Sequence, residues 1–407
     1  MNRSPLARVL GSTAVIVGVA LALRFAFVLS MGGKYFFADT LEYEEAAMRV
    51  LAGQAPGATS PRAPLFPIEM ALGFLLGGAH NYFAVRLLQL VLAAAMLVVG
   101  MRIAERFAGR PAAVLTGWCI ALTPTLVFTV GMLYPTTLYA TMLIVALAAA
   151  LAADETPSPR HGAVLGAALS FGYLTDPVAL APALALLGWL AGGAWRDRRV
   201  LVPFAAAILA IVVVLGPYVA WRKAAYGNKA VFMQKAQYVL HYSRTDSTLA
   251  EGRQVQLPAG MPYVPLATGA FVRQEVKLLR EQPAAYVHDV ASEFLHFFKP
   301  LPDRIQTKNQ YNRGPVLWIG ALSFIPVLVF SIVGLLFGAG TTRRRWGLAT
   351  LVLATAGIYA LFFTQTRYRI PVEPMMIVLA ALGLLRVFPA LGRWLDGGAT
   401  EQASPRA

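Results

Sequence analysis

Apolar residues fall in blocks of about 20 along the chain, and short arginine-rich stretches separate the blocks. A helix needs about 20 predominantly apolar residues to cross the hydrocarbon core of a membrane. The pattern therefore predicts about ten spanning helices. They cover residues 9–30, 82–101, 112–133, 136–153, 162–176, 178–195, 200–221, 315–339, 348–364 and 371–388.

The arginines predict how these helices are oriented. Short loops rich in Lys and Arg stay on the cytoplasmic side of a membrane. If the helices alternate in direction, the arginine-rich stretches all fall on one side, so both termini are predicted to be cytoplasmic. These stretches hold Arg3, Arg8, Arg102, Arg106, Arg110, Arg160, Arg196, Arg198, Arg199, Arg343 to Arg345, Arg386 and Arg393.

One apolar segment, residues 64–78, does not fit the alternation. It is short, it holds Pro67 and Glu69, and counting it as a span would place the cluster from Arg102 to Arg110 outside. We therefore predict a helix that lies at the outer membrane interface. The first apolar block is too long for a signal peptide and is interpreted as an anchor.

Four regions follow from this topology. Residues 1–221 form an N-terminal membrane module, whose first outer loop is 32–80. Residues 222–313 form an extracytoplasmic loop, in which a helical pattern over 269–299, broken at Pro283, predicts a small cap. Residues 314–396 form a C-terminal membrane module, and 397–407 form a cytoplasmic tail.

Composition supports a membrane protein and excludes several other classes. The chain is 57% hydrophobic and 14% charged, with a mean hydropathy of +0.60, whereas soluble domains carry roughly 25% charged residues. A lone cysteine, Cys119, excludes a disulfide scaffold. The net charge of +15 lies mostly in the short loops, so it reflects topology and lipid headgroups, and no nucleic-acid partner is predicted.

Asp39 is the first charged residue whose position calls for an explanation, because it lies in the outer loop directly before an amphipathic helix. Tyr43 lies on the apolar face of that helix and Glu42 on its polar face. An Asp followed three residues later by Glu is a helix-capping pattern. A carboxylate at the mouth of a membrane core is also a candidate general base. The two roles are compatible.

Arg367 and Arg369 bracket Tyr368 in a short outer loop, where arginine is expected to be scarce. Guanidinium groups bind phosphate with two parallel hydrogen bonds, so the pair is a candidate anion clamp. The alternatives are that both arginines reach lipid headgroups, or that Arg369 pairs with Glu373 four residues on.

Three further residues are weaker candidates. Arg62 is another cation of the first outer loop, and Arg86 lies inside the second predicted span, where it either serves the site or packs against Glu69. Asp176 precedes a proline between two spans, which is typical of a turn, or it is a second acid near the site.

The sequence contains no evident set of metal ligands. It has no Asp-x-Asp pair, and its five histidines lack metal-ligand spacing. No cofactor is predicted, and a divalent metal is left open. A carboxylate base, an arginine clamp and a membrane core together indicate chemistry on a lipid phosphate outside the cytoplasm, where nucleotide-activated donors are not expected.

At these residues the chain resembles the polytopic GT-C glycosyltransferases of the family 39 type, which include protein mannosyltransferases and lipid A aminoarabinose transferase. Four stretches carry the resemblance: Asp39-Thr-Leu-Glu-Tyr43 with 51–53 and 62–67, then 216–227, then 280–300, and Arg367-Tyr-Arg-Ile-Pro-Val-Glu-Pro374. The resemblance implies an all-α polytopic GT-C fold with Asp39 as the catalytic base. It implies that Arg367 and Arg369, together with Arg62, contact the carrier phosphate. Further candidate substrate contacts are Tyr43, Glu42, Arg86 and Tyr368.

The function expected from the resemblance is transfer of a sugar, with inversion, from a polyprenyl-phosphate donor to a lipid, glycan or protein of the cell envelope. The expected location is the extracytoplasmic face of the inner membrane, among membrane lipids. Two rivals remain open. An O-antigen ligase or polymerase would depend on His241 and Arg244 of the large outer loop, and a lipid-linked sugar flippase would favour internal repeats, which the sequence lacks.

Overall fold

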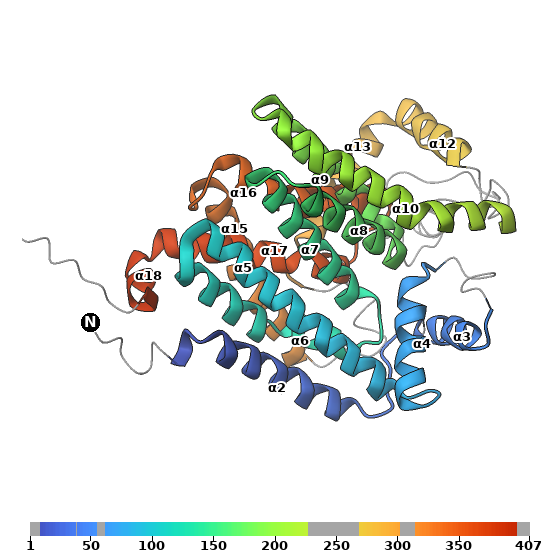
Figure 1. Ribbon diagram of the computed structural model, residues 1–407, viewed down its shortest axis with the longest axis horizontal. Coiled ribbons are helices and arrows are strands. Elements are labelled where there is room, and N and C mark those ends of the chain that lie inside the picture. Colours follow the sequence, from blue (N-terminus) through green and yellow to red (C-terminus); the bar gives the residue numbers. More distant parts are fainter. Residues whose placement is uncertain (1–8, 38, 55–61, 227–267, 302–313, 397–407) are drawn as a thin grey trace, which may run out of the picture.

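A computed structural model describes residues 9–37, 39–54, 62–226, 268–301 and 314–396 (Figure 1). In these ranges every regular element is a helix. Eight helical stretches of the described residues are long and apolar enough to cross a membrane. The all-α polytopic fold predicted from the sequence is therefore confirmed.

The ten predicted spans are all found as helices. They correspond to α2 (Thr13–Met31), the two parts of α5 (Tyr82–Leu122), α7 (Thr136–Glu155), α8 (Pro159–Thr175), α9 (Leu180–Ala191), α10 (Leu201–Tyr226), α15 (Gly314–Phe337), α16 (Thr342–Phe362) and α17 (Glu373–Val387). The ten predicted spans correspond to only eight long apolar stretches for two reasons. The kinked helix α5 is one stretch but holds two predicted spans, and α8, with 17 residues, is too short to be counted.

The boundaries of the second and third spans differ from the prediction. The backbone of α5 leaves the helical conformation only at Ala108 and Gly109, where Gly109 has a φ of 68°. Arg102 and Arg106 therefore extend the second span instead of forming a loop. The third span ends earlier, at Leu122, because Pro124 begins the short helix α6 (Pro124–Phe128), and η1 (Thr129–Gly131) follows it.

Two helices of the first outer loop cover the ends of the spanning helices. They are α3 (Asp39–Leu51) and α4 (Leu65–Gly77). With 13 residues, α4 is too short to cross a membrane, and it runs across the ends of α2 and α5 (Figure 1). It lies so close to α5 that a Cβ on Gly73 would stand 2.6 Å from Val85. The prediction of interfacial helices is confirmed.

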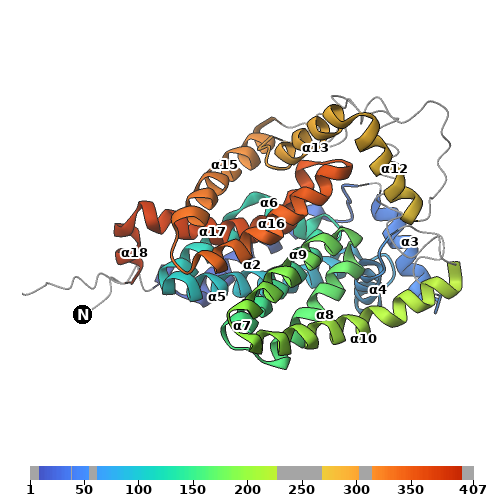
Figure 2. The same ribbon diagram turned by 90° about the horizontal axis from the view of Figure 1, so that it is seen from above.

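A small cap lies at the same end of the molecule as α3 and α4 (Figure 2). It consists of α12 (Thr268–Glu281) and α13 (Pro283–Phe297), which meet at the proline predicted to break them. The cap is anchored to the end of α16. Glu293 accepts a hydrogen bond from the backbone N–H of Thr364 at 2.8 Å, and the buried ring of Phe297 stacks on Tyr359.

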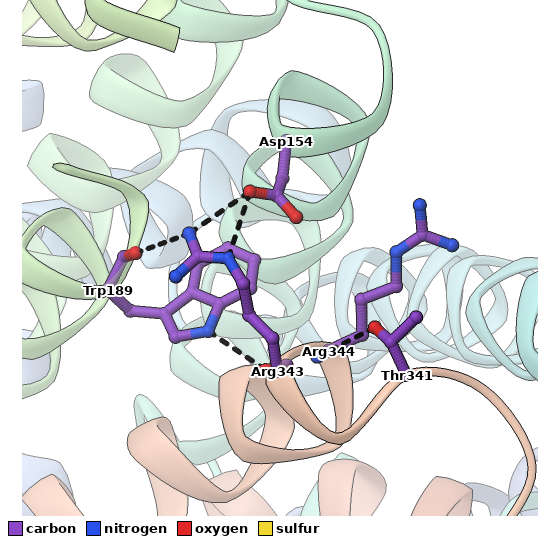
Figure 3. A network of polar contacts seen from close by, with 5 residues as sticks. All are labelled: Asp154, Trp189, Thr341, Arg343 and Arg344. Atoms are coloured by element: carbon purple, nitrogen blue, oxygen red, sulfur yellow. Dashed lines mark hydrogen bonds and ion pairs between the residues drawn. The ribbon is translucent and has the colours of Figure 1, made fainter. Parts of the chain in front are cut away.

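The opposite end of α16 carries an arginine network (Figure 3). Arg343 donates hydrogen bonds to Asp154 of α7 at 3.0 Å and to the carbonyl of Trp189 of α9 at 2.7 Å, and its guanidinium lies over the Trp189 ring. Arg344 pairs with Glu155 at 3.1 Å. Arginines assigned to cytoplasmic loops are thus joined at the end of the molecule away from the cap.

The central helix of the bundle is α7, which packs against α5, α8, α9, α16 and α17. Most of its side chains are buried, including Leu143, Ile144 and Leu147. Because α7 packs against these helices, the residues near its N-terminus are held beside the end of α8 and η7 (Thr366–Val372).

Candidate active site at the outer helix ends

Asp39 is the first residue of α3, and its carboxylate is held by side chains from two other segments. Its Oδ2 lies 3.1 Å from Nη2 of Arg62 and accepts a hydrogen bond from the hydroxyl of Tyr134 at 3.3 Å. In the described part of the chain, the Asp39 carboxylate makes no helix-capping hydrogen bond. The carboxylate is about one-third exposed, so it can be reached from outside.

Arg62 binds two carboxylates at once. Besides Asp39, its Nε donates to Glu42 at 2.8 Å, and its guanidinium lies 5.2 Å from the ring centre of Tyr43. Burial disfavours the charged form, but Tyr43, Glu42 and Asp39 outweigh this effect, and the pKa of Arg62 is raised above its ordinary value. Its charge is already engaged. In the structure Arg62 thus contacts Asp39, Glu42 and Tyr43, and its predicted contact with the carrier phosphate stays a prediction.

Tyr43 packs against Arg62 and Tyr134, the two residues that hold the Asp39 carboxylate. Its side chain is only 2% exposed and meets the rings of Phe66 and Tyr134 edge-on, with ring centres 5.1 Å and 5.7 Å away. Tyr43 thus belongs to the packed base of the site, while Glu42 lies on the exposed face of α3.

The segment that carries Tyr134 has a strained backbone. Leu133 is fully buried and has a φ of 52°, which a leucine rarely adopts. The hydroxyl of Thr40, next to Asp39, donates to the carbonyl of Leu133 at 3.4 Å. Strain of this kind persists only where surrounding contacts fix the backbone, and here it directs Tyr134 toward Asp39. The sequence reasoning missed Tyr134, although a Tyr-Pro pair at the outer end of a span is a detectable signal.

Arg367 lies on the other side of Tyr134. Its guanidinium is 4.7 Å from the ring centre of Phe37 and 5.5 Å from those of Tyr134 and Tyr368. Arg367 interacts electrostatically with Asp39, but it forms no ion pair with a carboxylate in the described ranges. Aromatic faces stabilise a cation without neutralising it. Arg367 therefore stays a candidate for binding an anion.

Arg369 is in a different situation, although it is only two residues away. It forms an ion pair of 3.0 Å with Glu373, and both side chains are buried. It also donates to the carbonyl of Lys299 at 2.7 Å, and its guanidinium packs on Phe324. Of the interpretations of this loop, the structure shows the pairing of Arg369 with Glu373, and the anion clamp stays a prediction.

Arg86 is also engaged by the protein itself. It is fully buried and donates to backbone carbonyls of Gly131 at 3.1 Å, of Gly32 at 2.5 Å and of Lys34. It does not pair with Glu69, which instead accepts a hydrogen bond from Gln89 at 2.8 Å. Arg86 thus joins the end of α2 to η1 and fixes the start of the first outer loop.

A pocket opens beside Arg367, between α7, α16, η7 and the corner of α8 and η2 (Pro177–Ala179). Tyr368 lies in its wall and stacks on Tyr359, with ring centres 4.3 Å apart and planes 10° from parallel. Asp176 also lines it, and its Oδ1 accepts a turn hydrogen bond from the backbone N–H of Val178. The lining residues are Tyr134, Pro135, Thr136, Tyr139, Asp176, Tyr359, Arg367, Tyr368 and Pro371.

The described residues do not include a cluster of three or more His, Cys, Asp or Glu side chains placed to hold a metal ion. His241 and Arg244, on which the ligase interpretation depends, lie outside the described residues.

Fold and site together define the class of the protein. It is an integral, multi-pass helical membrane protein, in which Asp39 and Arg367 both contact Tyr134 at one end of the helices.

Comparison with known proteins finds a family match over part of the chain and a shared fold. Residues 61–221 match the family described as Dolichyl-phosphate-mannose-protein mannosyltransferase. This match confirms the resemblance to the protein mannosyltransferases over that part of the chain, and the structural matches below show a shared fold. No curated protein matches the sequence.

Two solved structures share the fold. ArnT from Cupriavidus metallidurans, bound to undecaprenyl phosphate, aligns with a TM-score of 0.62 and 17% identity over 94% of this chain and 62% of that one. The oligosaccharyltransferase AglB from Archaeoglobus fulgidus, in complex with an inhibitory peptide and a dolichol-phosphate, aligns with a TM-score of 0.54 and 14% identity, over 93% and 50%. The chain thus spans less than two thirds of the length of both.

Proposed function

We propose that this chain is a membrane glycosyltransferase that moves a sugar from a polyprenyl-phosphate donor to an acceptor of the cell envelope. The observation that carries the proposal is the shared contact of Asp39 and Arg367 with Tyr134. It brings a carboxylate suited to accept a proton close to a guanidinium suited to bind a phosphate. The similar structures of ArnT and AglB, which hold undecaprenyl phosphate and a dolichol-phosphate, support a lipid-phosphate donor.

In the proposed reaction, Asp39 accepts the proton of an acceptor hydroxyl as the acceptor oxygen attacks the anomeric carbon of the donor. The bond between that carbon and the phosphate oxygen breaks, and its electron pair leaves with the polyprenyl phosphate. Attack opposite the leaving group inverts the configuration through an oxocarbenium-like transition state. Arg367 stabilises the negative charge that develops on the phosphate.

The other predicted site residues act through Asp39 and Arg367. Arg62, held by Glu42 and packed on Tyr43, orients the Asp39 carboxylate toward the acceptor. Tyr368 forms part of the aromatic surroundings of Arg367. Arg369 and Arg86 stabilise the loops that carry the site.

We further propose that the site faces the extracytoplasmic side of the inner membrane. The arginine network of Arg343 and Arg344 lies at the opposite end of α16 from the cap, and positive loops remain cytoplasmic. Both termini are then cytoplasmic. The acceptor is a lipid, a glycan or a protein of the envelope.

The experiment that tests the function uses purified protein in proteoliposomes with a panel of undecaprenyl-phosphate sugars labelled in the sugar. Envelope fractions serve as acceptors. The proposal predicts that label leaves the donor lipid and appears on an acceptor, with release of one undecaprenyl phosphate per sugar. Label that crosses the bilayer while still attached to its lipid would identify a flippase instead.

A further inference from the structure

We propose that Asp176 and Tyr139 form a sugar subsite, in which they hydrogen-bond ring hydroxyls of the donor while the adjacent Arg367 receives its phosphate. The inference rests on the proposed function, and it names the part of the donor that the pocket recognises. The three residues come from the α8–η2 corner, α7 and η7, and they line one pocket.

Tyr139 carries the first observation. Its side chain is 2% exposed, and its hydroxyl has no hydrogen-bond partner among the described residues. Buried hydroxyl groups in proteins are nearly always paired. A phenylalanine would fill the same space in the apolar helix α7 without this cost. Because Tyr139 lines the pocket, the missing partner is a group that enters it.

Asp176 carries the second observation. Its Oδ1 accepts from the backbone N–H of Val178 at 3.2 Å, a turn contact that needs no burial. Asp197 makes the same contact with Arg199 at 2.9 Å and is exposed to solvent. Asp176, in contrast, is 8% exposed and interacts electrostatically with Tyr139 and Tyr359. Burying a carboxylate is costly, so its place in the pocket indicates a role beyond the turn.

The chemistry of the pocket lining suits a phosphorylated sugar. The stacked rings of Tyr359 and Tyr368 offer an apolar wall, and the few polar groups converge from other sides. Hydroxyl groups suit a carboxylate and a phenol, whereas phosphate suits only the guanidinium. In a sugar phosphate, the phosphate is bonded directly to the sugar ring. One ligand of this class therefore satisfies Arg367, Asp176 and Tyr139 together.

The test compares two probes on variants of the full-length protein. The probes are undecaprenyl phosphate and the undecaprenyl-phosphate sugar of the panel that binds the wild type most tightly. We expect Tyr139→Phe and Asp176→Asn to bind the bare phosphate as the wild type does. Both variants should bind the sugar-bearing donor about 10-fold more weakly, the effect of losing one or two hydrogen bonds, one of them to a charged group. Asp197→Asn is the matched control, and it should change neither affinity.

Several results would overturn the inference. Unchanged affinity of both variants for the sugar-bearing donor would exclude a sugar subsite. Equal losses for the two probes would mean that Asp176 and Tyr139 only shape the phosphate site. Unchanged donor affinity with a higher KM for the acceptor would assign the pocket to the acceptor instead. If the wild type transfers no sugar at all, the proposed function is wrong, whereas the binding comparison of the two probes still tests the sugar subsite.

Discussion

Residues of the same type take different roles in this site because their neighbours differ. Arg367 and Arg369 are two positions apart, yet one lies among aromatic rings and the other in a buried ion pair with Glu373. Arg369 and Glu373 are four residues apart, so the sequence alone already allowed their pairing as an alternative to the anion clamp. The aromatic surroundings of Arg367 come from three separate segments, and no local pattern reports them.

This difference predicts opposite effects of two substitutions. Arg367→Ala should weaken binding of undecaprenyl phosphate roughly 10- to 100-fold, because it removes a charge-assisted contact, and should change stability little. Arg369→Ala should lower the free energy of unfolding by about 3–5 kcal/mol, because it leaves the buried Glu373 carboxylate unpaired. Lipid binding and thermal unfolding in detergent measure the two effects.

A double variant serves as the control for Arg369. Replacing the pair with Arg369→Met and Glu373→Leu removes both charges, and it should recover most of the lost stability. If Arg369→Ala weakened lipid binding and left stability unchanged, Arg369 would belong to the phosphate site after all.

Glu69 of α4 predicts a pH effect on stability. Burial raises the pKa of Glu69 to about 8, although its hydrogen bond with Gln89 opposes the shift. Among the described residues, its Oε2 and the Oε1 of Gln89 are both buried without a hydrogen-bond partner, so the site holds no group that would favour the charged carboxylate beyond the Gln89 amide. The folded protein thus retains this proton up to a pH of about 8, whereas the unfolded chain loses it near 4.5.

The contribution of Glu69 to stability should therefore fall as pH rises from about 4.5 to about 8, and level off above that range. Glu69→Gln carries a permanently neutral group, so it should remove this part of the pH dependence. Unfolding midpoints of both proteins between roughly pH 5 and pH 9 test the prediction. Identical pH slopes for the two would contradict it.

At the scale of elements, hydropathy predicted the spans, the interfacial helix and the cap helices, because apolar length and proline position are local properties. It misplaced the ends of the second and third spans, since arginines continue a helix beyond the membrane core until Gly109 ends it. Hydropathy does not tell which helices are neighbours. Tyr134, Tyr139 and Asp176 therefore form a site with Arg367 only once α7, α8 and η7 are packed.

The packing of α8 on α10 gives a prediction at this scale. Gly166 of α8 lies so close to α10 that an added Cβ would stand 2.2 Å from the carbonyl oxygen of Ala207. Gly166→Ala should therefore lower the free energy of unfolding by about 1–3 kcal/mol. Because Asp176 is the C-cap residue of α8, the pocket should be disturbed as well.

Gly188→Ala in α9 is the matched control, since no atom lies within 4 Å of an added Cβ there. It should leave thermal unfolding unchanged or raise the midpoint slightly, because alanine favours helix. Equal stability of the two variants would mean that α8 and α10 are not in close contact.

At the scale of the whole molecule, the acid–arginine site and the network of Arg343 and Asp154 lie at opposite ends of the helices. Sequence reasoning found this polarity from the arginines alone, because charge placement follows topology. Because arginine-rich loops stay cytoplasmic, the end with Arg343 is predicted to face the cytoplasm and the acid–arginine site the opposite side.

Cysteine labelling checks this orientation. In a background with Cys119→Ala, Lys277→Cys in the cap should react with a membrane-impermeant maleimide in intact cells. Trp195→Cys, at the arginine-rich end, should react only after permeabilisation. Both positions are well exposed. The side chain of Lys277 is 71% exposed, and Trp195 as a whole residue is 93% exposed. The reverse pattern would place the candidate site in the cytoplasm.

The most direct test of the central claim compares sugar transfer by the wild type and by Asp39→Asn, with donor binding measured on the same samples. Asparagine keeps the size of the side chain and can still accept a hydrogen bond from Tyr134, but it is not a general base. We predict unchanged binding of the undecaprenyl-phosphate sugar and turnover lower by at least about 100-fold. Near-normal turnover in Asp39→Asn would contradict the account and leave Asp39 as a structural residue of α3.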